Sequence, residues 1–160
     1  MDAAEPAAQT LRELLAATVT ALEAAAVPDE ALGRMRAPRR FARSRVIEPI
    51  GRAWRLGVLL LSRDCLLYST GTVTRAVEPP MGTANKSPEA EERREDRRAA
   101  VRGRFAEGEV VNFDVESIDL DVPGEPLVLV SGQLMVRWSV SGLAPLDRYL
   151  AERVALLIES

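Results

Sequence analysis

The stretch that decides the fold is Trp54-Arg-Leu-Gly-Val-Leu-Leu-Leu61, followed after a short break by Leu67-Tyr-Ser-Thr-Gly-Thr-Val-Thr-Arg-Ala-Val77. The first part is apolar enough for a central β-strand, and the second is rich in β-branched residues. The break at Ser62–Cys65 predicts a turn. Cys65 stands where a tight hairpin favours a residue with positive φ. We therefore predict an antiparallel meander over residues 54–77, whose first strand runs from 54 to 61.

A second hairpin is predicted near the C-terminus. Residues 127–130 and 134–140 are two apolar strand segments that flank Ser131-Gly132, a connection typical of tight hairpins. Before them, apolar and acidic residues alternate over residues 109–122, which predicts further strands with acidic polar faces.

Three segments have helical patterns. Leucines recur at helical spacing over residues 6–27, and Pro28 ends that pattern. Ser87 and Pro88 are typical of a helix start, and the helix they predict, to about Arg102, is nearly all Glu and Arg. An apolar stripe over residues 146–158 predicts a C-terminal helix.

Together these patterns predict an α+β fold. We expect an antiparallel sheet of about six to seven strands, packed by the N-terminal and C-terminal helices, with one exposed charged helix in the middle. The 160 residues fit a single domain, 1–160. Within it we expect an N-terminal helix over 1–28, a basic connector over 29–53, and the sheet with the other two helices over 54–160.

The composition excludes several classes of chemistry. The chain has no histidine, which removes His-based triads and the commonest zinc sites, and its single cysteine excludes an internal disulfide. No apolar run is long enough to cross a bilayer, and no secretory signal precedes the first helix. We therefore expect a cytoplasmic protein that needs no membrane, metal or cofactor.

Arginine is concentrated between residues 34 and 55, and this gives the candidate binding residues. One interpretation is a surface for an anionic ligand, with nucleic acid the less favoured form of it. The other is that these arginines pair with the acidic stretch 106–125, which holds seven acids and no base. Two more arginines fall inside predicted strands and could each hold a carboxylate. The candidates are Arg39, Arg40, Arg43, Arg75 and Arg137.

Three further features have a chemical interpretation and a structural one. Asp114, Glu116, Asp119 and Asp121 could share a hard cation, but acidic residues also protect strand edges. Cys65 beside Arg63 could be a thiolate or a small apolar residue. Thr83 precedes Lys86 by three residues, as in Ser-x-x-Lys hydrolases, but within a Pro/Gly-rich loop.

The run Gly51-Arg-Ala-Trp-Arg-Leu-Gly-Val-Leu-Leu-Leu-Ser-Arg-Asp64, with Leu67–Gly71, resembles short uncharacterised proteins of GC-rich, actinobacterial-type bacteria. Glu91-Glu-Arg-Arg94 and Gly108-Glu-Val-Val-Asn112 look similar too, and the resemblance covers residues 46–158. Some of these proteins are labelled glutaminase. That label implies amide hydrolysis, but no motif of known chemical role comes with the resemblance, and we assign no catalytic residue from it.

The function we predict from these observations is a non-enzymatic binding or assembly module that forms a homo-oligomer. The exposed sheet edges implied by the hairpins and the apolar C-terminal stripe favour assembly. The alternatives are a small amidohydrolase and a phosphate or nucleic-acid binder that uses the arginine-rich segment.

Overall fold

The structure, a computed structural model, describes residues 4–36, 44–81 and 87–160. These residues form three helices and ten strands, which divide into two compact units. Unit 1 comprises Met1–Asp29, Ala53–Ser69 and Glu116–Ser160, and unit 2 comprises Glu30–Arg52 and Thr70–Val115. Strand β2 (Val46–Leu56) belongs partly to each unit. That the whole chain behaves as a single domain stays a prediction.

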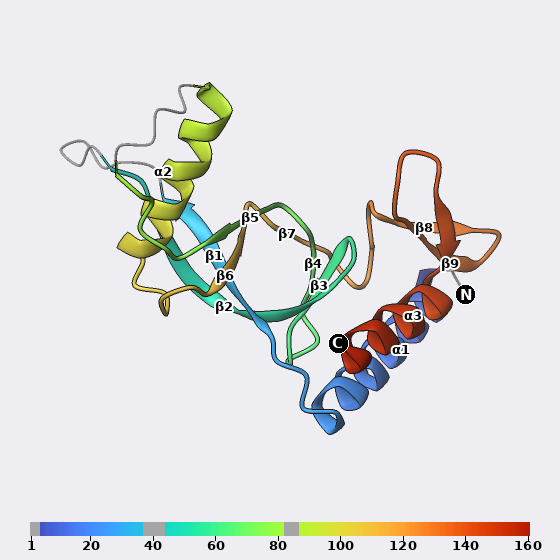
Figure 1. Ribbon diagram of the computed structural model, residues 1–160. Helices are drawn as coiled ribbons and strands as arrows, with labels where there is room; N and C mark the ends of the chain where they lie inside the picture. Colours follow the sequence, from blue (N-terminus) through green and yellow to red (C-terminus); the bar gives the residue numbers. More distant parts are fainter. Residues whose placement is uncertain (1–3, 37–43, 82–86) are drawn as a thin grey trace. The chain divides into compact units, whose positions relative to one another are not determined.

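Unit 1 contains two helices that lie side by side, α1 (Ala4–Ala24) and α3 (Leu146–Glu159) (Figure 1). Helix α1 buries Leu11, Leu15 and Leu22 completely because their spacing places them on one face. The same core takes in Trp54, whose Nε1 donates to the carbonyl oxygen of Val27 at 2.8 Å. Both predicted terminal helices are confirmed.

Two sets of strands complete unit 1. The end of β2 pairs with β3 (Leu59–Leu61), which pairs with β4 (Leu67–Ser69) and then β7 (Glu116–Ser117), all antiparallel. A separate sheet has the order β10-β9-β8, from Leu143–Pro145, Gln133–Arg137 and Leu127–Val130. The predicted hairpin is therefore confirmed, with positive φ at both Ser131 and Gly132.

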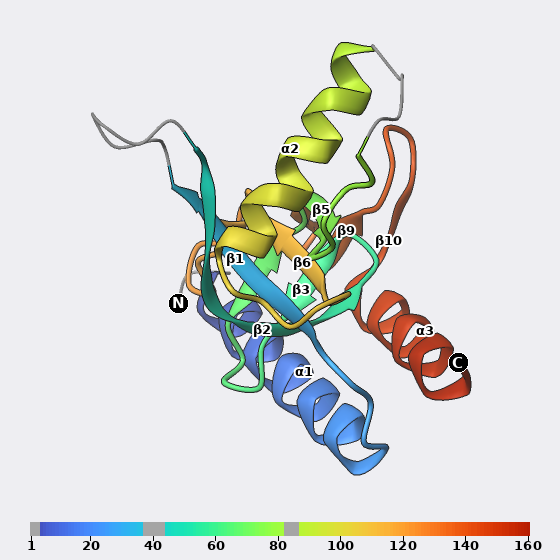
Figure 2. The ribbon, with the colours of Figure 1, turned by 60° about the vertical axis from the view of Figure 1, so that its left-hand side comes forward.

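Unit 2 is a sheet covered by one helix. Its strand order is β5-β6-β1-β2, where β1 is Glu30–Arg36, β5 is Thr72–Arg75 and β6 is Val110–Phe113. Strands β1 and β6 run parallel, whereas β5 and β6 run antiparallel. Helix α2 (Pro88–Arg102) lies against one face of this sheet, and its N-terminal half extends beyond the strands (Figure 2).

The predicted fold class is confirmed, with one refinement. Pairing through β2 gives a seven-stranded order, β5-β6-β1-β2-β3-β4-β7, within an α+β fold that has helices at both ends of the chain. The prediction of a wholly antiparallel sheet missed the parallel pair β1–β6, so the sheet is mixed.

The prediction of a basic connector over residues 29–53 is wrong, because β1 and most of β2 occupy this segment. Ala31, Leu32 and Ile47 are fully buried, so the segment supplies core residues as well as charge. Pro49 and Gly51 do not stop β2 because they lie in its exposed middle, where a missing backbone donor carries little penalty.

The predicted strand over 54–61 is also wrong in one respect, because it is two strands joined by a tight turn. Gly57 adopts a φ of +66°, and a side chain at this position would overlap the hydroxyl of Tyr149. That hydroxyl accepts a hydrogen bond from the backbone N of Val58 at 2.9 Å. The predicted turn at Ser62–Cys65 is confirmed, and Cys65 has a φ of 63°.

Candidate functional site

Unit 2 contains a polar pocket at one end of its sheet. The parallel strands β1 and β6 both end near it, and Met35, one residue before the end of β1, and Phe113, the last residue of β6, line it; β5 begins there at Thr72. The pocket has a volume of about 350 Å³. Its lining is completed by Arg45, just before β2, by Asp114, just after β6, and by four residues of α2, namely Glu89, Glu92, Arg93 and Asp96.

Helix α2 presents charged residues to this pocket because the spacing of its residues places them on the same face as its buried alanines. Ser87 caps the helix, its Oγ accepting from the backbone N of Ala90 at 3.1 Å. At the C-terminal end, Ala99 and Ala100 are fully buried against the sheet. Asp96 lies one turn before Ala99 and Ala100, and Glu92 lies two turns before them, on the same side of the helix. The face that is apolar at the C-terminal end is therefore acidic in its middle.

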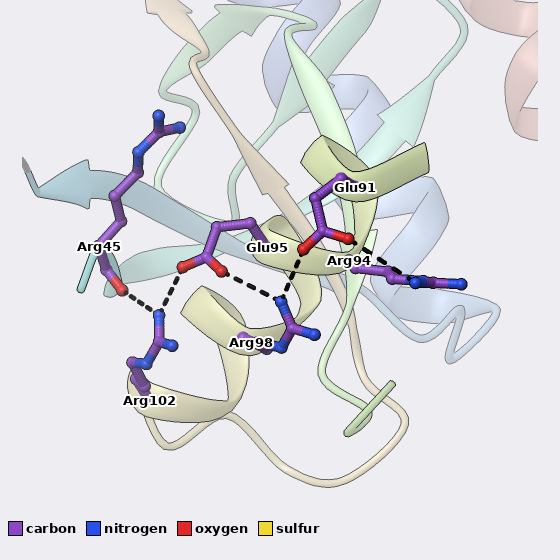
Figure 3. A network of polar contacts seen from close by, with 6 residues as sticks. All are labelled: Arg45, Glu91, Arg94, Glu95, Arg98 and Arg102. Carbon is purple, nitrogen blue, oxygen red and sulfur yellow. Dashed lines mark hydrogen bonds and ion pairs between the residues drawn. The ribbon is translucent and has the colours of Figure 1, made fainter. Parts of the chain in front are cut away.

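A different face of α2 holds a network of alternating charges (Figure 3). Arg98 contacts Glu91 at 3.2 Å and Glu95 at 3.3 Å, and Arg102 contacts Glu95 at 2.9 Å. Arg102 also donates to the backbone oxygen of Arg45 at 3.0 Å, which links this network to the start of β2. The network thus fixes the helix beside the pocket without using the pocket's own carboxylates.

The two faces of α2 shift carboxyl pKa values in opposite directions. Burial raises the pKa of Asp96 above its ordinary value of 3.8, and the nearby charges of Glu92 and Asp114 raise it further, against the opposing effect of Arg45. Hydrogen bonds from Arg102 and Arg98 lower the pKa of Glu95, although partial burial opposes them. Negative charge is therefore balanced on the outer face and in excess inside the pocket.

The backbone around the pocket is closely packed. A side chain at Gly71 would collide with the carbonyl oxygens of Phe113 and Asp114, so only glycine allows β5 to start this close to the end of β6. Asp114 itself has a φ of 54°, which is uncommon for a residue other than glycine. These two features fix the positions of Thr72 and Asp114 at the pocket wall.

The predicted binding arginines do not form one site. Arg75 is exposed on β5 and donates to the carbonyl of Gly108 at 3.2 Å, in unit 2. Arg137 is exposed on β9 in unit 1 and contacts Glu125 at 3.3 Å. Arg39, Arg40 and Arg43 lie outside the described residues.

Other arginines of the basic segment have acidic partners. Arg36 forms an ion pair with Glu48, and Arg52 with Glu109, which belongs to the acidic stretch 106–125. These pairs support the interpretation in which the basic segment neutralises neighbouring acids. Arg45 differs from them because it lines the pocket.

The remaining candidates of the sequence are dispersed. Asp114 lines the pocket of unit 2, whereas Glu116, Asp119 and Asp121 belong to unit 1, where Asp121 pairs with Arg12. Within the described ranges, no group of acidic or cysteine side chains is arranged to hold a metal ion. Cys65 is half-buried in unit 1. Thr83 and Lys86 lie outside the part of the chain that the structure describes.

Sequence reasoning missed Glu92 and Asp96, the central carboxylates of the pocket. The available signal was their spacing of four residues on the helix face that continues into Ala99-Ala100.

Among the residues described, no helix is long and apolar enough to span a membrane. Comparison with family models, with curated proteins and with solved structures gives no match.

Proposed function

We propose that the protein is a non-enzymatic binding module that holds a small cationic molecule in the pocket of unit 2. The observation that carries the proposal is the environment of Asp96, a partly buried carboxylate among like charges. Asp96 lies on the face of α2 that lines the pocket, which we call the inner face. A carboxylate in this environment is stabilised by any positive charge that enters the pocket.

The charges of the pocket favour a cation over an anion. Four carboxylates line it (Glu89, Glu92, Asp96 and Asp114) against two guanidinium groups (Arg45 and Arg93), so that its formal charge is −2. A ligand with ammonium groups would offset this charge and donate hydrogen bonds to carboxylate oxygens.

The size and the apolar part of the lining favour an aliphatic amine. A volume of about 350 Å³ lies within the range of small-molecule sites. Met35 and Phe113 supply apolar surface, against which a short methylene chain would pack. The ligand class that fits is therefore a small alkyl amine or guanidine.

Isothermal titration of putrescine, spermidine and agmatine into the full chain tests this proposal. We expect binding that Asp96→Asn and Glu92→Gln each weaken by about 10- to 100-fold, because a charge-assisted hydrogen bond contributes about 1.5–3 kcal/mol. Glu116→Gln is the matched control, since Glu116 is an exposed carboxylate of unit 1. Failure of all three amines to bind, or binding of inorganic phosphate instead, would overturn the proposal.

Assembly into a homo-oligomer is the second candidate. Strand β8 is an edge of the three-stranded sheet of unit 1, and its Leu129 and Val130 are exposed. An exposed apolar edge strand is a template for another strand. The residues of β8, Leu-Val-Leu-Val, are apolar along the whole strand, so two copies can pair antiparallel with apolar residues opposite each other.

Light scattering after size exclusion tests this second candidate. We expect a dimer that Val130→Lys converts to a monomer, because lysine on an edge strand opposes pairing. Gln133→Lys on the adjacent central strand is the control for an added charge. A strict monomer at high concentration contradicts assembly without affecting the pocket.

The two remaining alternatives stay predictions. An amidohydrolase of the kind implied by the resemblance would need a pocket that joins Thr83, Lys86 or Cys65 to an acid. Thr83 and Lys86 lie outside the described residues, and Cys65 is half-buried in unit 1. A phosphate or nucleic-acid surface would need several unpaired arginines, and the described pairs of Arg36 and Arg52 with acids do not favour it.

A further inference from the structure

We propose that binding in this pocket is linked to protons: a proton on Asp96 and a bound cation oppose each other, so that acidification weakens binding of the ligand. The inference rests on the proposed function, since it concerns the regulation of the same site.

The position of Asp96 suits it to this role. It lies in the middle of α2, on the inner face, and shares the pocket with Glu92 one turn before it. From the strands, Asp114 faces it after β6 and Arg45 faces it before β2, and Glu95 adds a weaker negative charge from the helix itself. Glu89 and Arg93 complete the charged lining.

This arrangement makes a proton and an ammonium group competitors. The negative charges of Glu92 and Asp114 favour any positive charge at Asp96, whether it is a proton on the carboxylate oxygen or a cation beside it. Once Asp96 is protonated, the formal charge of the pocket changes from −2 to −1, and one anionic acceptor becomes a neutral carboxyl group. The ligand therefore loses both attraction and a hydrogen-bond partner.

The neighbouring carboxylate Glu95 does not compete for this role. Arg102 and Arg98 hydrogen-bond to it and lower its pKa, while burial and like charge raise the pKa of Asp96. Burial and like charge thus make Asp96 easier to protonate than an ordinary aspartate, while its arginine partners make Glu95 harder to protonate than an ordinary glutamate. The site therefore has one carboxyl group that is shifted toward proton uptake, held on a helix whose other face keeps its ion pairs.

Titration of putrescine into the full chain from about pH 7.5 to about pH 4.5 tests the linkage. Below the raised pKa of Asp96, affinity should fall by up to about tenfold per pH unit, with protons released on binding. Asp96→Asn should bind more weakly but with a flat pH profile over this range. The control Glu116→Gln should keep the affinity and the pH slope of the wild type.

The outcomes separate this inference from the function on which it rests. Binding with the same affinity at every pH would overturn the proton linkage and leave the binding site intact. No binding at any pH would overturn the proposed function itself. Carboxyl NMR provides a further measurement: the pKa of Asp96 should fall when putrescine saturates the protein, and an unchanged pKa would overturn the linkage.

Discussion

The two units of this protein build their cores from different residues. The core of unit 1 is made of large side chains, with Leu11, Leu15, Leu22 and Trp54 almost completely buried. The core of unit 2 contains four alanines among its seven buried members, and two of them, Ala99 and Ala100, belong to α2. The helix of unit 2 is thus held by small contacts and polar links, whereas the helices of unit 1 are held by leucine.

This difference separates the tasks of the two units. Burying a large aliphatic side chain contributes about 1.5–3 kcal/mol, and an alanine contributes much less. Unit 1 can therefore supply most of the hydrophobic stabilisation, while unit 2 can place Glu92 and Asp96 on the inner face of a helix. Asp96 is half-buried beside the exposed Glu92. A carboxylate held among like charges destabilises a fold, and proteins keep such features mainly at sites of function.

The largest predicted effect is the loss of stability when a leucine is removed from the core of unit 1. Leu15 is fully buried, so Leu15→Ala should lower the free energy of unfolding by about 3 kcal/mol. The matched change in unit 2, Ala99→Gly, removes a smaller group and should lower it by about 1 kcal/mol, mainly through helix propensity.

Urea unfolding measured by circular dichroism gives both values, and tryptophan fluorescence follows unit 1 separately, because Trp54 and Trp138 both belong to it. Thr20→Ala, at an exposed position of α1, is the control for substitution within that helix. If Ala99→Gly proved as damaging as Leu15→Ala, the division of tasks between a leucine core and an alanine core would be wrong.

The helices and the last hairpin could be predicted because local signals fix them. Ser87-Pro88 starts α2, and Ser131-Gly132 supplies the two positive φ angles of the β8–β9 turn. The parallel pairing of β1 with β6 could not be predicted, because it joins residues about eighty positions apart through backbone bonds that leave no local pattern. Pro49 and Gly51 concealed β2, since their exposure in the strand is a tertiary property.

The pocket could be predicted only in part. The sequence shows that α2 is charged nearly all round, and a helix of this kind has no apolar stripe to indicate which charges point inward. Two alanines at its end, packed against Ile47 and Val111, decide the orientation. The contribution of Asp114 depends on the end of β6 and on the close approach of Gly71, neither of which the helix pattern contains.

The smallest predicted effect is the difference between the two faces of α2 in how their carboxylates change the stability of the fold with pH. The lowered pKa of Glu95 means that its ion pairs stabilise the fold above its ordinary pKa of 4.5, and that this stability is lost as the pH falls through the lowered value. The raised pKa of Asp96 has the opposite sign: its charged form destabilises the fold as the pH rises from 3.8 through the raised value.

At neutral pH, Glu95→Gln should therefore lower the free energy of unfolding, and Asp96→Asn should raise it. Each change should be a few tenths of a kcal/mol, because solvent screens both carboxylates. Urea midpoints at neutral pH and near pH 3 measure this, and the two variants should differ less in acid, where the wild-type carboxylates are increasingly protonated. Destabilisation by Asp96→Asn at neutral pH would show that Asp96 is a structural ion-pair partner, and the excess of negative charge assigned to the pocket would then be wrong.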